Sequence, residues 1–183
     1  MGDGLIYFRD GELIAEIGDT RIYKMNGKLF LEKGVGHTLW ALEDELEDYI
    51  YQLESWPRGN CLEIGLGLGV ASKYILSFPK VKSLTTVEID ADVIMAQKIA
   101  DPIDDDRHLI LNAHGLYYAY ETKRFYDFIF LDFYDVIDED TLPMIADMAA
   151  ACERILKRGG RMIGWLDKHT PGDHAALFMT LFE

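Results

Sequence analysis

The chain has 183 residues, of which 49% are hydrophobic and 27% are charged, and this composition predicts a globular domain with a buried core rather than a disordered chain. Its formal net charge of −14 would repel a phosphate backbone, which disfavours DNA or RNA as a partner. No apolar run reaches the ~20 residues that cross a bilayer, and the N-terminus lacks the regions of a signal peptide, so we expect a soluble cytoplasmic protein with no membrane partner.

Short strands and turns are expected at the N-terminus. Residues 21–25 and 29–31 flank Asn26-Gly27, a dipeptide typical of a two-residue hairpin turn. From Leu39 to Leu53 apolar residues recur at helical spacing, which predicts a helix over that stretch. We therefore divide the chain into a β-hairpin region over residues 1–36 and an α/β domain over residues 37–183.

Beyond residue 60 the pattern becomes strand, glycine or polar turn, and helix, repeated along the chain. Five apolar strands are predicted, over residues 61–64, 83–89, 108–111, 126–131 and 161–166. Helices are predicted between them, the fourth ending at Gly159-Gly160. This alternation predicts a parallel sheet covered by helices on both faces, with every strand's carboxyl end on one ligand-binding edge.

A glycine-rich loop follows the first of these strands. Gly65, Gly67 and Gly69 permit a tight turn and let a ligand approach the backbone, while the next helix offers free N–H groups. Glu88 ends the second strand about 20 residues further on, where a carboxylate accepts hydrogen bonds from both ribose hydroxyls. Together these features predict a cofactor that contains a nucleoside.

Other polar residues, in or after the strands, indicate which nucleoside-containing cofactor the chain would bind. Glu63 lies inside an otherwise apolar strand, and a buried carboxylate requires a partner. The pyrophosphate of a dinucleotide would repel it, whereas the ammonium of an amino acid would pair with it. Asn112 and Ala113 follow the third strand and are candidates for adenine contacts. Asp132 ends the fourth strand, where it is placed to hold an ammonium or a reacting group.

The order of these motifs resembles the class I S-adenosylmethionine-dependent methyltransferases. Residues 62–69, Leu-Glu-Ile-Gly-Leu-Gly-Leu-Gly, resemble motif I of that superfamily, residues 87–90 its second motif and residues 126–132 its fourth. The resemblance implies a doubly wound Rossmann-like parallel sheet, the class I methyltransferase fold, with S-adenosylmethionine as cofactor. It implies ribose binding by Glu88 and adenine contacts from Ile89, Asn112 and Ala113. It further implies contacts with the methionine end from the following residues: Glu63, Gly65, Gly67 and Gly69.

Within that superfamily the spermidine synthase-like subgroup is the most similar. Its members also begin with β-hairpins, and they carry Asp-Ser-Ser-Asp where this chain has Asp132-Phe133-Tyr134-Asp135. Aminopropyltransferases have an aspartate in motif I where this chain has Leu68, and small hydroxyl residues where it has Phe133 and Tyr134. These departures favour methyl transfer over aminopropyl transfer.

No metal is predicted. Small O-methyltransferases resemble residues 126–132 as well, but their metal site needs an Asp-Asn pair after the fifth strand, where this chain has Asp167 followed by Lys168. Cys61 and Cys152 show no zinc spacing, and their apolar surroundings predict buried, reduced thiols.

The main functional expectation is methyl transfer from S-adenosylmethionine to an unidentified small-molecule acceptor. Asp132 is the candidate catalytic residue, and the candidate acceptor contacts are Phe133, Tyr134, Asp135 and His37. Two alternatives stay open: an aminopropyltransferase like spermidine synthase, or a non-catalytic cofactor-binding module. About 16 residues follow the fifth strand, too few for the strands that usually complete this sheet. Either the N-terminal hairpins substitute for them or a partner subunit covers an unpaired edge, and we predict a homodimer.

Overall fold

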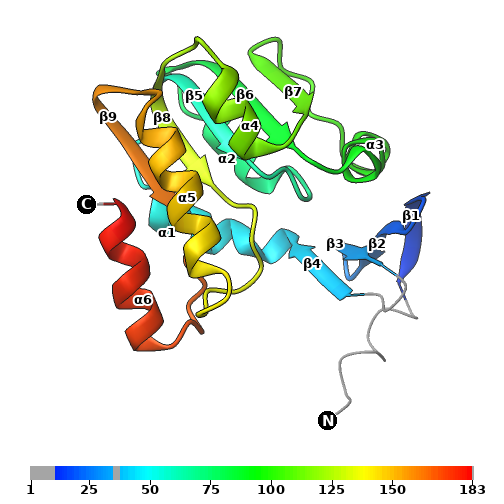
Figure 1. Cartoon of the computed structure of the whole chain (residues 1–183). Coiled ribbons are helices and arrows are strands. Elements are labelled where there is room, and N and C mark those ends of the chain that lie inside the picture. The colour runs from blue at the N-terminus through cyan, green and yellow to red at the C-terminus, as the bar shows by residue number, and fades with distance from the viewer. Residues whose placement is uncertain (1–10, 35–37, 183) are drawn as a thin grey trace.

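The structure is a computed structural model that describes residues 11–34 and 38–182. The N-terminal part of the described chain is a four-stranded antiparallel sheet in the order β1-β2-β3-β4 (Figure 1). Its strands are β1 (Glu12–Ile17), β2 (Thr20–Met25), β3 (Lys28–Lys33) and β4 (Thr38–Leu42). Asn26 and Gly27 join β2 to β3 with φ of 52° and 82°, the left-handed pair that a two-residue hairpin turn requires. The hairpin prediction is thereby confirmed.

The helix predicted from Leu39 is wrong in its first part. Leu39 and Leu42 lie in β4, and helical structure starts only at η1 (Glu43–Glu45) and continues as α1 (Leu46–Leu53). The register of β4 against β3 shifts at Trp40, because Leu39 lies opposite Glu32 while Ala41 lies opposite Leu31. This shift breaks the alternation of period two by which a strand is recognised, and the sheet consequently extends to Leu42, beyond residue 36.

The rest of the chain is built on a five-stranded parallel sheet, as the sequence predicts. Its strands lie in the order β7-β6-β5-β8-β9, and each neighbouring pair is parallel. The strand bounds are β5 (Gly59–Ile64), β6 (Val81–Glu88), β7 (His108–Asn112), β8 (Tyr126–Leu131) and β9 (Leu156–Gly164). The strand order reverses at β5 and β8, which is where open α/β sheets bind their ligands.

Helices cover both faces of this sheet (Figure 1). Their bounds are α2 (Val70–Leu76), α3 (Ala91–Ala100), α4 (Gly115–Glu121), α5 (Leu142–Glu153), α6 (Gly172–Met179) and the short η2 (Thr180–Phe182). Successive residues of β5 serve opposite faces: Cys61 packs with α1 and α2, and Leu62 packs with α5. Burying a side chain such as Leu62 stabilises the folded state by roughly 1.5–3 kcal/mol. Because alternate residues of β5 need cover on opposite faces of the sheet, this alternation determines which face each helix covers.

The end of α5 differs from the sequence prediction. The helix ends at Glu153, and β9 begins at Leu156, before Gly159-Gly160 rather than after it. Leu156 pairs with Tyr126, so the edge strand β9 already contains three residues before it reaches the glycines. Gly159 has φ of 76°, and the pairing of β9 with β8 shifts between Tyr126 and Phe128. The two glycines therefore lie in an irregular stretch of an edge strand, and they do not terminate the helix.

The two sheets are joined through α3. Ala96 of α3 packs in a cluster with Ile22, Leu31 and Ala41 of the antiparallel sheet, and Leu68 of the glycine-rich loop completes this cluster. The antiparallel sheet is thus held beside the carboxyl-end edge of the parallel sheet. In the described part of the chain, no helix is long and apolar enough to span a bilayer.

Candidate functional site

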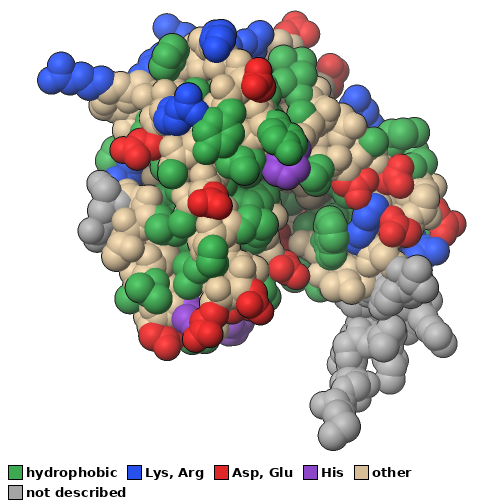
Figure 2. Space-filling view, viewed as in Figure 1, with side chains coloured by type: hydrophobic (Ala, Val, Ile, Leu, Met, Phe, Trp, Pro, Cys, Tyr) green, Lys and Arg blue, Asp and Glu red, His purple; other side chains and the backbone are tan. Residues whose placement is uncertain are grey.

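A cavity of about 680 Å³ lies at the carboxyl ends of β5, β6 and β8, within the usual size range of small-molecule sites. One wall is formed by the loops that follow these strands, and β3 and β4 of the antiparallel sheet form the opposite wall. Figure 2 shows the surface hollowed between the two parts of the molecule. The site therefore lies at the edge that the sequence pattern indicates.

The glycine-rich loop approaches the neighbouring strand end very closely. Gly65 has φ of 99°, and a Cβ atom there would lie 1.8 Å from the carbonyl oxygen of Asp132. The amide of Asp132 in turn donates to the carbonyl of Ile64 at 2.8 Å. Because a side chain at position 65 would collide with backbone, only glycine fits. Gly67 also lines the cavity, whereas Gly69 does not and packs against Gln97 instead.

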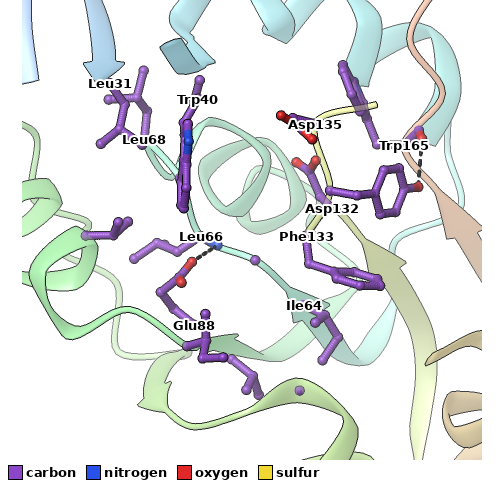
Figure 3. A pocket seen from close by; sticks show the side chains of 18 of the residues that line it. Leu31, Trp40, Ile64, Leu66, Leu68, Glu88, Asp132, Phe133, Asp135 and Trp165 are labelled. Carbon is purple, nitrogen blue, oxygen red and sulfur yellow. Dashed lines mark hydrogen bonds between the residues drawn. The ribbon is translucent and has the colours of Figure 1, made fainter. Parts of the chain in front are cut away.

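Glu88 is held in place by two backbone amides. One carboxylate oxygen accepts from the amide of Leu66 at 2.9 Å, and the other accepts from the amide of Asp90 at 2.9 Å (Figure 3). Burial raises the pKa of Glu88, and these amide bonds oppose the rise. Each carboxylate oxygen keeps a further lone pair, so a pair of ribose hydroxyls can be accepted at the cavity wall.

Glu63, expected at the methionine end of the cofactor, lies behind the cavity rather than in its wall. Residues alternate along β5, so the side chain of Glu63 faces α2 while Ile64 faces the cavity. Its carboxylate accepts from the hydroxyls of Ser72 and Thr86, the latter at 2.6 Å. Burial raises the pKa of Glu63 to about 8. In this arrangement Glu63 ties β5 to β6 and α2.

Asn112 and Ala113, expected near adenine, brace the end of β6. The side-chain amide of Asn112 donates to the carbonyls of Glu88 at 3.0 Å and Ile89 at 2.9 Å, and the backbone amide of Ala113 donates to the carbonyl of Glu88 at 3.0 Å. Neither residue lines the cavity, whereas Ile89 and His114 do. The bracing holds Ile89 at the cavity wall.

Asp132 takes part in a cluster with two residues of η1 and α1 that the sequence pattern does not reveal. The hydroxyl of Tyr49 lies 2.8 Å from a carboxylate oxygen of Asp132 and 3.1 Å from one of Glu45. Burial raises the pKa of Asp132 to about 6 and that of Glu45 to about 8, and the charge of Asp132 contributes to the second shift. The cluster lines the cavity and places ionisable oxygens where a cationic ligand would be stabilised.

The three residues after Asp132 have different surroundings. Phe133 and Tyr134 line the cavity with their rings 5.1 Å apart in an edge-to-face contact, and the hydroxyl of Tyr134 donates to the carbonyl of Trp165 at 2.7 Å (Figure 3). Asp135 is exposed at the rim. His37, the remaining candidate for the acceptor site, lies outside the described residues.

The charge of the cavity wall is uniform. Among the described residues that line it there are no lysines or arginines, and the carboxylates are Glu45, Glu88, Asp132, Asp135 and Asp147. A wall of this kind favours a cation. The described residues form no cluster of three potential metal ligands. Cys61 and Cys152 are free and buried, as expected from the sequence.

The strand order, the glycine-rich loop and the carboxylate that ends β6 place the chain in the S-adenosylmethionine-dependent methyltransferase-like fold class. Within it, the fold is that of spermidine synthases. The spermidine synthase from Thermotoga maritima superposes with a TM-score of 0.68 at 20% identity, covering 93% of this chain and 62% of that one. A spermidine synthase in complex with the transition-state analogue AdoDATO gives 0.65, also at 20% identity, covering 93% and 61%.

Similarity in sequence points the same way over shorter stretches. A polyamine aminopropyltransferase from Bacillus mycoides (strain KBAB4) is 29% identical over 129 residues, which cover 68% of this chain and 46% of that protein. One from Hydrogenobaculum sp. (strain Y04AAS1) is 35% identical over 83 residues, covering 43% and 30%. The chain thus spans less than half the length of these relatives. No family model matches it.

Proposed function

We propose that this chain is an aminopropyltransferase that uses decarboxylated S-adenosylmethionine as donor and a cationic amine as acceptor. The observation that carries the proposal is the cavity wall, where five acidic side chains and no lysine or arginine are found among the described residues. The similarity to polyamine aminopropyltransferases supports it. Of the functions considered from the sequence, aminopropyl transfer thus replaces methyl transfer as the main hypothesis.

The described residues suit the parts of such a donor. Glu88 offers carboxylate oxygens for ribose hydroxyls, and the backbone of Gly65 and Gly67 lines the cavity without side chains. The sulfonium of the donor supplies an activated carbon. In the reaction the amine nitrogen forms a bond to that carbon, the carbon–sulfur bond breaks, and its electron pair stays on sulfur as a neutral thioether.

Asp132 is the residue we assign to the proton that the amine must lose. It lies in the cavity wall, and its pKa near 6 makes it a base of suitable strength around neutral pH. The hydroxyl of Tyr49 holds one of its carboxylate oxygens, which fixes the orientation of the carboxylate. The other oxygen stays available to accept a proton.

Methyl transfer is the second candidate, and one observation favours it. Leu68 stands where aminopropyltransferases carry an aspartate, and here it is buried in an apolar cluster with Leu31 and Ala41. The part of the cavity near the loop therefore lacks a carboxylate at this position, which would favour the donor whose amino group has no carboxylate of its own beside it.

The two candidates are separated by presenting the protein with each donor. Decarboxylated S-adenosylmethionine and S-adenosylmethionine are incubated in turn with a panel of diamines and monoamines, and the products are identified by mass spectrometry. We expect aminopropylated amines with the first donor and none with the second. Asp132→Asn should lower the turnover number by roughly 10²-fold or more, the range of general base catalysis, while donor affinity stays within about twofold.

Methylated products would establish the second candidate instead. If the donor binds but no group is transferred to any acceptor, the chain is instead a non-catalytic cofactor-binding module. Asp135→Asn, which alters an exposed carboxylate at the rim of the same cavity, serves as the matched control, and it should affect the turnover number far less than the change at position 132.

A further inference from the structure

An irregularity of β4 places Trp40 in the wall of the cavity. Between Leu39, opposite Glu32, and Ala41, opposite Leu31, the strand contains one residue more than its partner, so Trp40 is the extra residue of a β-bulge. Bulges re-aim side chains and are frequent next to functional sites. The sequence alternation alone would not place a tryptophan here.

The indole of Trp40 stands in the cavity rather than in the core. Its exposed fraction is 48%, and it lines the cavity wall that faces the glycine-rich loop. Figure 3 shows the ring projecting between Leu68 on one side and Asp135 on the other, above Leu66 and Glu88. An indole exposed inside a pocket offers a ligand a large, rigid contact surface.

The chemistry of the surroundings indicates which part of a ligand would meet this ring. In a sulfonium nucleoside the sulfur follows the ribose toward the reacting group. Glu88 is placed to hold the ribose and Asp132 to receive the proton, so the sulfonium would lie between them, in the same cavity that Trp40 lines. The face of tryptophan attracts cations more strongly than that of any other side chain.

We propose that Trp40 recognises the positive charge of the donor's sulfonium with its indole face, and thereby discriminates the charged donor from the neutral thioether product. This inference rests on the proposed function. The ring loses its charge-dependent attraction when transfer leaves sulfur neutral, whereas Glu88 holds the ribose of donor and product alike. Trp40 is therefore a specificity-determining residue that favours donor binding and product release.

The test compares matched pairs of nucleosides that differ by one methyl group and one charge at sulfur. The pairs are S-adenosylmethionine with S-adenosylhomocysteine, and decarboxylated S-adenosylmethionine with its S-demethylated thioether. Dissociation constants are measured by calorimetry for the wild type, Trp40→Phe and Trp40→Leu. We expect Trp40→Leu to weaken the sulfonium ligands by roughly 2- to 30-fold and the thioethers by less than about twofold, with Trp40→Phe in between.

Trp56→Leu is the matched control, because Trp56 lies outside the cavity lining and its ring is covered by the guanidinium of Arg161 at 5.2 Å. This variant should leave all four constants unchanged. Equal weakening of sulfonium and thioether ligands by Trp40→Leu, or no weakening of either, would overturn the inference while leaving the proposed function standing. A wild type that binds none of the four nucleosides would instead overturn the proposed function, and the inference with it.

Discussion

At the scale of single residues, hydrogen-bonding groups run from Glu45 through Tyr49 to Asp132. If both carboxyl groups are ionised, these groups hold one proton for two hydrogen bonds. The hydroxyl of Tyr49 lies within hydrogen-bonding distance of both carboxyl groups but has one proton to donate. Its shorter contact, 2.8 Å, is with Asp132. If Glu45 is protonated, it donates to the phenol oxygen while the phenol donates to Asp132, so each of the two contacts has a proton. The pKa of Glu45 near 8 agrees with a proton on this residue at neutral pH.

This arrangement predicts that Glu45→Gln stabilises the protein more at pH 8 than at pH 5. Burial raises the pKa of Glu45 to about 8 in the folded protein, whereas an unfolded chain has an ordinary glutamate pKa of ~4.3. The folded state thus binds more protons between these values, so the stability of the wild type falls as the pH rises through this window. Glutamine is neutral at every pH and keeps a hydrogen bond to Tyr49.

Chemical unfolding at the two pH values measures the difference. The stabilisation should be larger at pH 8 by about 1–3 kcal/mol, allowing for partial exposure and coupling to Asp132. Glu47→Gln, an exposed change in α1, should alter the free energy of unfolding by less than about 0.5 kcal/mol at either pH. A Glu45→Gln effect that is the same at both pH values would contradict the proton on Glu45.

At the scale of elements, one lysine joins the antiparallel sheet to α3, the helix that follows β6 and Glu88. The ammonium of Lys33 at the end of β3 lies 2.5 Å from the carboxylates of both Asp19 and Asp90, and its side chain is 13% exposed. Asp90 caps α3 by accepting from the amide of Asp92 at 2.8 Å, and its own amide donates to Glu88. Lys33 therefore connects the orientation of the antiparallel sheet to the geometry around Glu88.

Lys33→Met should lower the free energy of unfolding by about 1–3 kcal/mol, because it leaves the mostly buried carboxylate of Asp90 and the exposed carboxylate of Asp19 without their shared cation. It should also weaken nucleoside binding, since the cavity wall formed by β3 and β4 loses its tie to α3. Denaturant unfolding and calorimetric titration measure the two effects. Lys28→Met, in β3 of the same sheet, removes an exposed ion pair with Asp44 of η1 and should change stability far less. Equal effects of the two substitutions on stability and nucleoside binding would argue against a connection between the antiparallel sheet and α3 through Lys33.

At the scale of the whole molecule, the charge of the chain and the charge of the cavity have the same sign. The formal net charge is −14, and carboxylates line the cavity between the two sheets. Acidic side chains lie beside the hollow in Figure 2. A field of this sign raises the local concentration of cations at the cavity mouth. The homodimer expected from the sequence stays a prediction.

The charge predicts that salt weakens the binding of a cationic acceptor. Because the Debye length falls from tens of ångströms at low salt to about 8 Å at physiological ionic strength, the KM of a diamine should rise roughly 3- to 10-fold between about 20 and 300 mM NaCl. Initial rates at saturating donor measure it. The dissociation constant of an uncharged nucleoside such as 5′-methylthioadenosine should change far less over the same range. A KM that is independent of salt would show that the acceptor does not bind as a cation.

Much of the fold and part of the site could be predicted because the signals are local. The turn at Asn26-Gly27 and the tight turn of the glycine-rich loop each depend on residues close in sequence, and the structure confirms both. The boundaries that failed, at the start of α1 and the end of α5, depend on pairing between strands. The bulge at Trp40 and the irregular start of β9 at Leu156 interrupt the alternation of period two by which a strand is recognised in a sequence.

The sequence alone sufficed to predict the parallel sheet, the edge at which the cavity lies and the position of Glu88, because strand, turn and helix patterns depend on consecutive residues. What surrounds Asp132 is known only from the folded structure. Tyr49 reaches it from 83 positions away, and Trp40 enters the same cavity from the antiparallel sheet. The folded structure also shows that Glu63 faces Ser72 and Thr86 instead of the cavity. Such contacts depend on how separate elements pack, and no local pattern records that packing.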